Sequence, residues 1–494
     1  MKVPLTTVFL AINHGITCRY FLQTKIFEEL RKNVDQLVLL VPDPKDEYFK
    51  EYVKNENVVL ERYKLYECEE YGSSNRIERF LDSIRPYIQN GKHNMATTEG
   101  IYQAFLKDQV DTIAKLHGIR RILRKSETVF MKMAVTISRK FKSVRRLILL
   151  IEHRFFSPPI HADVFDKYQP DMLIVSSLGT FHYDQYLMRE ARRRSVEVIS
   201  VILSWDNTTT RGMPSAVPDK VLAWTDTMRK ELIELNDIIE DKILVGGVAH
   251  YDHYFNNEAI YGRDKFYREL GLNVERDIIF LGTKSPNCYT SNAYIAKLIL
   301  EAIQDGDFVN DCQLLVRMHP IYYRRNKDGL LFKHFRDEMM DLRNSYDHLT
   351  INEPVMASVN LSYSMPTSEI NVLASILKYS SVVVNMFSTL NIEASIFDVP
   401  IVNVSFEGVI PDHLKKARYD INMDLEQSHN QRVITSGGVA MAYTSEQLIP
   451  LINQELSDPK KRRSGRESIV KREVGPNKGV AGQAIASLIM KGRI

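Results

Sequence analysis

The segment with the clearest chemical pattern, residues 381–403, reads as a strand, a short polar turn, a helix and a second strand. Ser388 and Thr389 fall where the predicted helix begins. The backbone N–H groups at a helix start have no partner within the helix, and the positive end of the helix dipole lies there. Phosphate oxygens can therefore bind at this position. Glu393 comes about one turn later, where a carboxylate can accept hydrogen bonds from two vicinal hydroxyls, such as those of a ribose. The alternative is capping of the helix by Ser388 without any ligand.

Two more loops at predicted strand ends carry groups suited to phosphate. Arg317 and His319 close one strand, just before a proline that stops it. Thr283 and Lys284 follow the first strand of the C-terminal half. We expect these four residues to contact the phosphate groups of a ligand, because ligands of parallel sheets bind at the carboxyl ends of the strands. The alternative for Arg317 and His319 is a strand end with a purely structural role, and the alternative for Lys284 is a side chain that is only solvated.

A polar loop at residues 203–212 follows a strand in the N-terminal half. It presents Trp205, Asp206 and Asn207 beside several hydroxyls. An aromatic face next to hydrogen-bonding groups suits a sugar ring, so we interpret Trp205 and Asn207 as acceptor-binding residues. Asp206 is a candidate catalytic base. The alternative is a tight Asx-type turn with Trp205 in the core.

His14 lies in the loop after the first predicted strand and is the second candidate base. A histidine titrates near neutrality, and the neighbouring Gly15 would allow close approach of a substrate. A lone histidine in a loop can also be ordinary polar surface.

The elements that must position these residues alternate between strand and helix. Strands are predicted at residues 7–12, 36–41, 172–176, 196–203, 220–224 and 242–245, and again at 278–281, 314–317, 348–351, 382–384 and 401–404. Strands separated by helices imply parallel sheets covered on both faces. We therefore predict an α/β protein with two doubly wound parallel-sheet domains, residues 1–250 and 260–475, and a closing helix within 476–494. Ligands should bind in a cleft between the two domains.

A helical insertion at residues 75–155 interrupts the first domain, and between residues 115 and 146 it is rich in Lys and Arg. Apolar side chains interleave with the basic ones at roughly helical spacing. Such a helix can lie on an anionic membrane surface or bind a polyanion. It can equally be a solvated helix that packs by its apolar side. No nucleic-acid motif accompanies the charge, so we expect no nucleic-acid partner.

Composition excludes several classes. The chain has 494 residues, 44% hydrophobic and 26% charged, with a net charge of +3, which is typical of a fully folded globular protein. The four cysteines lack the spacing of a zinc or redox site, and no GxGxxG or P-loop motif occurs. No apolar run reaches the roughly 20 residues that span a bilayer. The opening residues lack a signal cleavage site, so we read them as a buried strand and expect a cytoplasmic protein.

The segment around Glu393 resembles the donor-binding signature of GT-B glycosyltransferases and of the related UDP-GlcNAc 2-epimerases, in which a proline follows the glutamate by seven residues, as Pro400 does here. Residues 317–320 resemble the R-x-H-P motif of capsule polysaccharide and teichoic-acid-type transferases. The resemblance implies a GT-B fold, diphosphate at Ser388 and Thr389, ribose at Glu393 and donor phosphate at His319. It also implies no essential metal and no cofactor besides the nucleotide-sugar substrate.

The leading hypothesis is therefore a metal-independent glycosyltransferase of surface polysaccharide biosynthesis. It would move a sugar from a nucleotide diphosphate donor to a glycan or lipid-linked acceptor, in the cytoplasm or peripherally at the inner face of the cell membrane. Three alternatives remain open: a CDP-glycerol or polyol phosphotransferase, a UDP-sugar 2-epimerase and a non-catalytic nucleotide-sugar-binding protein.

Overall fold

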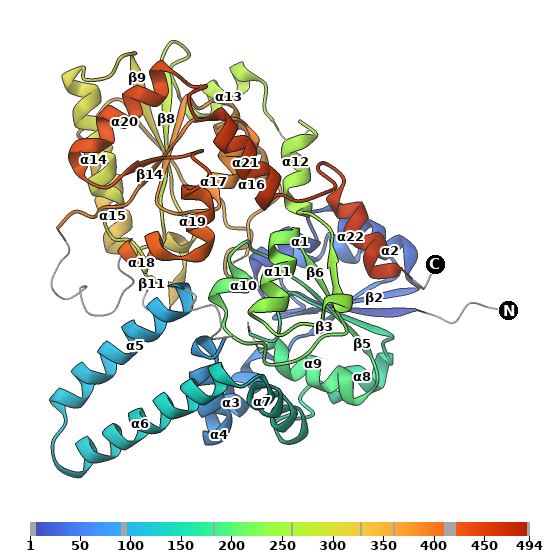
Figure 1. Ribbon diagram of the computed structural model, residues 1–494. Helices are drawn as coiled ribbons and strands as arrows, with labels where there is room; N and C mark the ends of the chain where they lie inside the picture. The colour runs from blue at the N-terminus through green and yellow to red at the C-terminus, as the bar shows by residue number, and fades with distance from the viewer. Residues whose placement is uncertain are drawn as a thin grey trace. The chain divides into compact units, whose positions relative to one another are not determined.

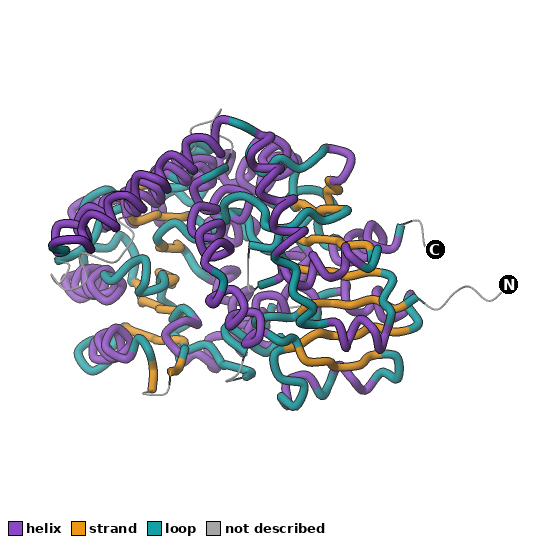
Figure 2. The backbone as a smooth tube through the Cα atoms, turned by 90° about the horizontal axis from the view of Figure 1, so that it is seen from below, coloured by secondary structure: helices purple, strands orange, loops and turns teal. Residues whose placement is uncertain are grey.

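A computed structural model describes residues 6–491 of the chain, apart from residues 90–95, 181–182, 258–259, 327–328, 359–360 and 410–420. The chain forms two compact units, residues 1–249 with 481–494 and residues 250–480. Each unit contains a parallel sheet with helices on both faces (Figures 1 and 2). This arrangement confirms the predicted fold class.

The first unit is built on a seven-stranded sheet of order β3-β2-β1-β4-β5-β6-β7, in which all neighbours run parallel. Its strands are β1 (Thr7–Ala11), β2 (Gln36–Val41), β3 (Val58–Arg62), β4 (Met172–Val175), β5 (Glu197–Val201), β6 (Lys220–Ala223) and β7 (Ile243–Val245). The central strands are continuous apolar runs because helices cover both faces. The chain runs from β1 outward to β3 and then returns to place β4 on the other side of β1.

The helices around this sheet include the C-terminal one, which packs against α2. They are α1 (Gly15–Phe21), α2 (Lys25–Asn33), α3 (Leu65–Ser74), α8 (Ala162–Tyr168), α9 (Asp184–Arg193), α10 (Asn207–Thr210), α11 (Asp226–Glu234) and α22 (Ala481–Met490). The first two helices of the chain, α1 and α2, are separate. Thr24 separates them, because its hydroxyl accepts the Ile26 N–H at 3.3 Å and so caps α2.

The predicted helical insertion is present as α4 (Arg76–Ile84), α5 (Ala96–Lys115), α6 (Gly118–Lys140) and α7 (Lys142–Phe155). In Figure 1, α5 and α6 extend away from the sheet of their unit as an arm. A small core that includes Tyr87, Tyr102 and Val135 joins these helices. Arg145 of α7 also pairs with Asp237 at 2.6 Å, which anchors the insertion to the loop after α11.

The second unit has a six-stranded sheet of order β12-β9-β8-β13-β14-β15, again parallel throughout. Its strands are β8 (Asp277–Gly282), β9 (Cys312–Arg317), β12 (Leu349–Asn352), β13 (Val382–Asn385), β14 (Ile401–Val404) and β15 (Ala440–Ala442), and a separate hairpin pairs β10 (Arg325–Asn326) with β11 (Gly329–Leu330). Its helices are α12 (Asp252–Phe255), α13 (Arg263–Leu270), α14 (Asn292–Asp305), α15 (Lys333–Leu342), α16 (Ser368–Tyr379), α17 (Leu390–Ile396), α18 (Ile421–Glu426), α19 (Ser428–Ile434), α20 (Ser445–Ser457) and α21 (Arg463–Glu473).

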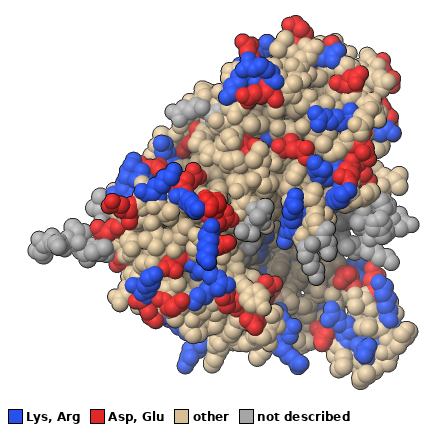
Figure 3. Space-filling view, turned by 180° about the vertical axis from the view of Figure 1, so that it is seen from behind, with Lys and Arg blue, Asp and Glu red and all other residues tan. Residues whose placement is uncertain are grey.

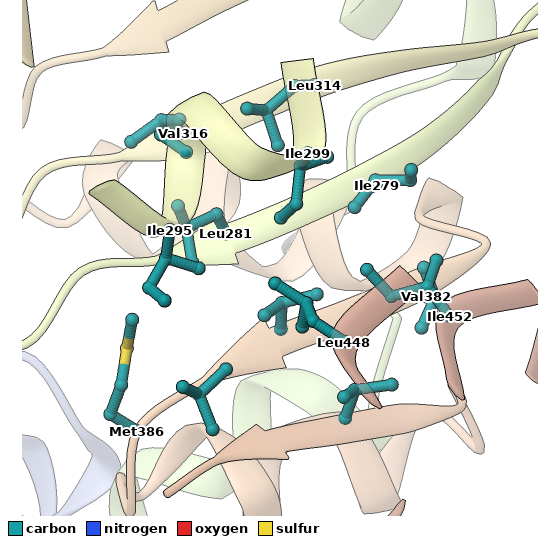
Figure 4. Close-up of a cluster of buried hydrophobic side chains, with 14 of the residues drawn as sticks. Ile279, Leu281, Ile295, Ile299, Leu314, Val316, Val382, Met386, Leu448 and Ile452 are labelled. Carbon is teal, nitrogen blue, oxygen red and sulfur yellow. The ribbon is translucent and has the colours of Figure 1, made fainter. Parts of the chain in front are cut away.

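The core of the second unit lies between this sheet and the helices α14 and α20 (Figure 4). Side chains from β8, β9 and β13 meet Ile295 and Ile299 of α14 and Leu448 and Ile452 of α20, all of them buried. This packing holds the carboxyl ends of the three central strands at one edge of the sheet.

No helix within the described ranges is long and apolar enough to cross a membrane. Among the same residues, no group of three or more His, Cys, Asp or Glu side chains is arranged to hold a metal ion.

Candidate functional site

The predicted donor residues of the second unit lie at the ends of three adjacent strands. The chain runs from β8 to β9 and β12, and then returns to place β13 on the other side of β8. The loops after β8 and β13 therefore leave the sheet in opposite directions, which is where doubly wound sheets bind ligands. Lys284 follows β8, His319 follows β9 and Ser388 follows β13. The three loops meet, since Lys284 Nζ lies 6.0 Å from the centre of the Phe387 ring and the His319 N–H donates to Thr283 Oγ1 at 2.8 Å.

The turn between β13 and α17 is held by buried asparagines that sequence reasoning did not single out. Phe387 adopts φ +46°, a left-handed conformation that is unfavourable for a bulky residue. Its N–H donates to Asn403 Oδ1 at 2.9 Å, and that oxygen also accepts from Asn391 at 3.2 Å. Asn385 donates to Asn391 at 2.8 Å. The sequence feature that could have indicated this turn is the presence of three asparagines in elements that are otherwise apolar.

Ser388 and Thr389 are half-buried at the start of α17. Ser388 Oγ accepts the Leu390 N–H at 3.3 Å, so the capping interaction weighed from the sequence is present. Thr389 makes no side-chain cap hydrogen bond. A Cβ at Gly282 would lie 2.1 Å from a methyl carbon of Leu390, so glycine at the end of β8 lets the first residue of α17 approach the strand.

Glu393 lies on the inner side of α17 and is 4% exposed. The hydroxyl of Tyr254, from α12, donates to Glu393 Oε1 at 3.0 Å. This hydrogen bond orients the carboxylate. Tyr254 was not a predicted site residue, because the contact joins residues that are far apart in the sequence.

The two predicted cations of the donor loops are paired with carboxylates. Lys284 forms an ion pair with Asp424 of α18, and Arg317 forms one with Glu369 of α16 at 2.7 Å. Both pairs are largely buried, with at most 15% of any of the four side chains exposed. Thr283 Oγ1 is occupied in joining strand ends, because it donates to the Arg317 carbonyl at 3.2 Å. A bound phosphate would thus compete with Asp424 for Lys284.

His319 is poised as a neutral hydrogen-bond donor. Its Nδ1 accepts the Ile321 N–H at 3.1 Å and caps a short helix, so in the neutral ring the proton resides on Nε2. Burial lowers the pKa of His319 to about 4, which keeps the ring neutral at physiological pH. A neutral Nε2–H can donate to a phosphate oxygen without adding charge.

The first unit contains a pocket at the corresponding position of its own sheet, between β1 and β4, where the chain changes direction. The pocket is open to solvent and encloses about 540 Å³ when the space at its mouth is included. Its wall is formed by His14 and Ile16 after β1, by residues after β4 and β5, and by the side chains of Asn207, Arg211 and Asn236. No Asp or Glu is among the described residues that line it.

His14 is buried and caps α1 rather than lying on the surface. Its Nδ1 accepts the Thr17 N–H at 3.2 Å, which leaves the proton of a neutral ring on Nε2. For Nε2 to accept a proton, the ring must adopt the other tautomer and lose the cap, at a cost of about 1 kcal/mol. In the observed arrangement His14 is a hydrogen-bond donor.

A buried network supports this end of the pocket. Asn13, which accepts from the Thr17 hydroxyl at 2.9 Å, donates to Asp184 at 3.0 Å. Tyr63 and Ser177 donate to the same carboxylate at 2.8 and 2.9 Å. Burial raises the pKa of Asp184 to about 6, although these hydrogen bonds lower it.

The side chains of the polar loop after β5 lie partly in the core and partly at the pocket. Trp205 is 4% exposed and belongs to the core, as the alternative interpretation required, while Asn207 lines the pocket. The Asp206 carboxylate accepts from the hydroxyls of Ser204 and Thr210, the latter at 3.0 Å. Asp206 therefore lies between two residues of the pocket wall, Ser204 and Asn207.

Comparison with known proteins identifies the fold. No family model matches the chain, and no curated protein matches its sequence. Solved structures with a similar fold include UDP-GlcNAc 2-epimerase from Neisseria meningitidis bound to UDP-GlcNAc, with 12% identity and a TM-score of 0.53 over 99% of this chain and 100% of that one. S. aureus MnaA in a structure with UDP has 11% identity and a TM-score of 0.54, over 98% and 96%. The epimerase from Methanocaldococcus jannaschii has 15% identity and a TM-score of 0.51, over 99% of both chains. The chain has a GT-B-type fold, which confirms the expected resemblance.

Proposed function

We propose that this protein is a glycosyltransferase that moves a sugar from a nucleotide diphosphate donor to a surface-glycan or lipid-linked acceptor. One observation carries the proposal most strongly. At the point where its parallel sheet changes direction, one unit carries the side chains that we assign to phosphate and ribose, and the other has a pocket lined by hydroxyl and amide groups. A transferase needs both a donor site and an acceptor site.

On the donor side, Ser388, Thr389 and the Nε2–H of His319 would bind the diphosphate, and Glu393 would bind the ribose. Lys284 would exchange Asp424 for a phosphate oxygen as the leaving group develops charge. Arg317 would act by holding the β9 loop, through its pair with Glu369. Hydrogen-bond donors and cations of this kind stabilise a leaving diphosphate without a metal ion, because they are oriented before the reaction begins.

On the acceptor side, the pocket of the first unit would hold the acceptor sugar or its lipid-linked equivalent. Asn207 and the Nε2–H of His14 would orient the acceptor, and Asp206 would remove the proton from its attacking hydroxyl. Asp206 is preferred as the base because His14 can accept a proton only by giving up its cap on α1. Trp205 would support the loop from the core.

The described lining of this pocket offers serine, threonine, asparagine, arginine and histidine side chains. These groups suit the binding of a polyhydroxyl acceptor.

The surface of the arm formed by α5 and α6 suits contact with an anionic membrane. We include this contact in the proposal. Along α6, bulky apolar side chains gather on one exposed face, with one helical turn between Leu123 and Phe130 that lacks them: Ile119, Ile122, Leu123, Phe130, Met133 and Ile137, each at least 44% exposed. The side of α6 that carries Val135 and Ser138 is buried against the rest of the insertion. Lys and Arg gather on the arm beside uncharged surface (Figure 3). Such a helix lies in the interface of a membrane with anionic lipids.

A second copy of this chain is a poorer partner for the same face. Symmetric pairing of two α6 helices would bring two strongly basic segments together, because residues 118–140 contain seven Lys and Arg and one acid, Glu127. Like charges in contact oppose such pairing, whereas anionic lipids neutralise them. We therefore expect the reaction to take place in the cytoplasm, at the inner face of the cell membrane.

The function is tested with a panel of UDP-, GDP-, CMP- and CDP-linked donors, each with and without lipid-linked acceptors. Release of nucleoside diphosphate that depends on the acceptor is the expected result. Donor isomerisation without release would identify an epimerase, release of CMP from a CDP-polyol would identify a phosphotransferase, and tight binding without turnover would identify a binding protein. An Asp206→Asn variant should bind donor normally and lose turnover.

Membrane contact is tested by co-sedimentation with vesicles. Vesicles that contain phosphatidylglycerol should bind the protein, pure phosphatidylcholine vesicles should not, and a Phe130→Ser/Met133→Ser variant should lose binding. If that variant instead converts a dimer to a monomer in light scattering and leaves sedimentation unchanged, the face is an interface between copies.

A further inference from the structure

A second pocket opens in the first unit between α7, α9 and residues 215–217, and the proposed transfer reaction makes no use of it. It encloses about 650 Å³ including its mouth. Its floor is apolar and is formed by residues that include Leu149, Met188 and Val217. Arg146 and Arg192 line the same pocket and give it a cationic rim, on which His153 also lies.

The rim carries positive charge that the described protein does not neutralise. Arg146 and Arg192 form no ion pair with any described residue, and the one hydrogen bond of the Arg192 side chain within the described structure is to the Val217 carbonyl, at 3.4 Å. Arg189 differs, because it is 1% exposed and pairs with Glu78 at 2.9 Å and with Glu152. Its charge is compensated inside the fold, so the two rim arginines are the groups available to an anion.

The pKa of His153 responds to the positive charge of the surrounding arginines. Its pKa lies below the ordinary value, because burial and the neighbouring Arg192, Arg189 and Arg193 all disfavour the protonated ring. A neutral imidazole beside two arginines can donate or accept a hydrogen bond without adding to the repulsion. The pocket thus has a local excess of positive charge beside the neutral imidazole of His153.

The floor restricts which anion fits. An inorganic anion would satisfy the arginines but leave the apolar surface of Leu149 and Met188 in water. The pocket is continuous with the exposed face of α7, on which Leu147 and Leu150 are 52% and 63% exposed. An anion with a hydrocarbon part would cover this surface as well, which stabilises the complex through apolar burial.

We propose that the pocket between α7 and α9 binds the phosphate group of a membrane lipid. Arg146 and Arg192 hold the phosphate oxygens, since the planar guanidinium matches their geometry. The first part of the lipid chain lies on Leu149, Leu150 and Met188. The insertion would then do more than touch the bilayer, because it would select lipids by their phosphate. The donor residues of the second unit take no part in this binding.

The test uses lipids that stay monomeric in solution, so that binding to a vesicle surface is not measured. Calorimetric titration with dihexanoyl phosphatidic acid is compared with titrations with dihexanoyl phosphatidylcholine and glycerol 3-phosphate. We expect the phosphatidic acid to bind at least about tenfold more tightly than either, because only it combines an exposed phosphate with acyl chains.

Two double variants remove the same charge from different places. Arg146→Ala/Arg192→Ala should weaken phosphatidic acid binding by about tenfold or more, and Arg120→Ala/Arg121→Ala on α6 should change it by less than about twofold. Leu150→Ser should weaken phosphatidic acid binding and leave glycerol 3-phosphate binding unchanged.

Three outcomes would overturn the proposal. Equal losses in the two double variants would mean general charge attraction. Equal affinity for glycerol 3-phosphate and phosphatidic acid would identify a site for free phosphate. Equal affinity for phosphatidylcholine and phosphatidic acid would mean partition into an apolar surface. Each outcome is independent of whether the protein transfers a sugar.

Discussion

Replacement of Glu393 by glutamine isolates the proposed ribose contact. The Tyr254 hydroxyl donates to Glu393 Oε1 at 3.0 Å, and the carbonyl oxygen of a glutamine can accept the same hydrogen bond. The substitution therefore keeps the shape and the tyrosine contact, and removes the negative charge. We expect the variant to fold normally.

The expected loss of binding free energy follows from the hydrogen bonds that two vicinal hydroxyls donate to one carboxylate. A hydrogen bond to a charged group contributes roughly 1.5–3 kcal/mol and a neutral one roughly 0.5–1.5 kcal/mol. The change thus costs about 1 kcal/mol per hydroxyl and about 2 kcal/mol for the pair, which raises the Kd by about 30-fold.

Calorimetric titration with the nucleoside diphosphate of the preferred donor, and with its 2′-deoxy analogue, measures this loss. The wild-type protein should discriminate against the analogue by about 30-fold, and Glu393→Gln by about fivefold, because a weaker bond is lost. Glu301→Gln, on the exposed side of α14, is the matched control and should behave as wild type. Equal discrimination in wild type and Glu393→Gln would refute the ribose assignment.

Three further predictions follow from the same geometry. The pKa of about 4 for His319 lies below its ordinary value, so its contribution to stability is present above about pH 6.5 and is lost as the pH falls towards 4. His319→Gln should flatten this part of the pH dependence of the urea midpoint, and an unchanged slope would contradict the assignment. Asn403→Ala should lower the free energy of unfolding by about 2–4 kcal/mol, because it leaves the buried N–H groups of Phe387 and Asn391 without their acceptor, while Asn33→Ala on the surface should change it by less than about 0.5 kcal/mol. EDTA should change turnover by less than about twofold, and a larger loss that Mg²⁺ restores would show that a metal takes part.

The sheet framework was predictable because its strands are buried on both faces. β2 and β14 have the bounds that their apolar runs indicated, Gln36–Val41 and Ile401–Val404. The edge strands β3 and β15 were not predicted. β3 ends in the polar pair Glu61 and Arg62, and β15 has three residues, so neither gives a long apolar run.

The strand ends were predictable, but not the partners of the residues on them. The sequence placed Lys284 and Arg317 in suitable loops, yet Asp424 and Glu369 reach them from helices far along the chain. Local pattern carries no information about such pairs. The role of His14 was likewise hidden, because a capping histidine and a loop histidine have the same sequence signal until the first turn of α1 is seen.

The claim that this protein transfers a sugar is tested most directly by the mass of its acceptor product. After incubation with the preferred donor, we expect the acceptor to gain one glycosyl residue and the nucleotide to leave as the diphosphate. An acceptor of unchanged mass beside an isomerised donor, or an acceptor that gains a polyol phosphate while the nucleotide leaves as the monophosphate, would contradict it.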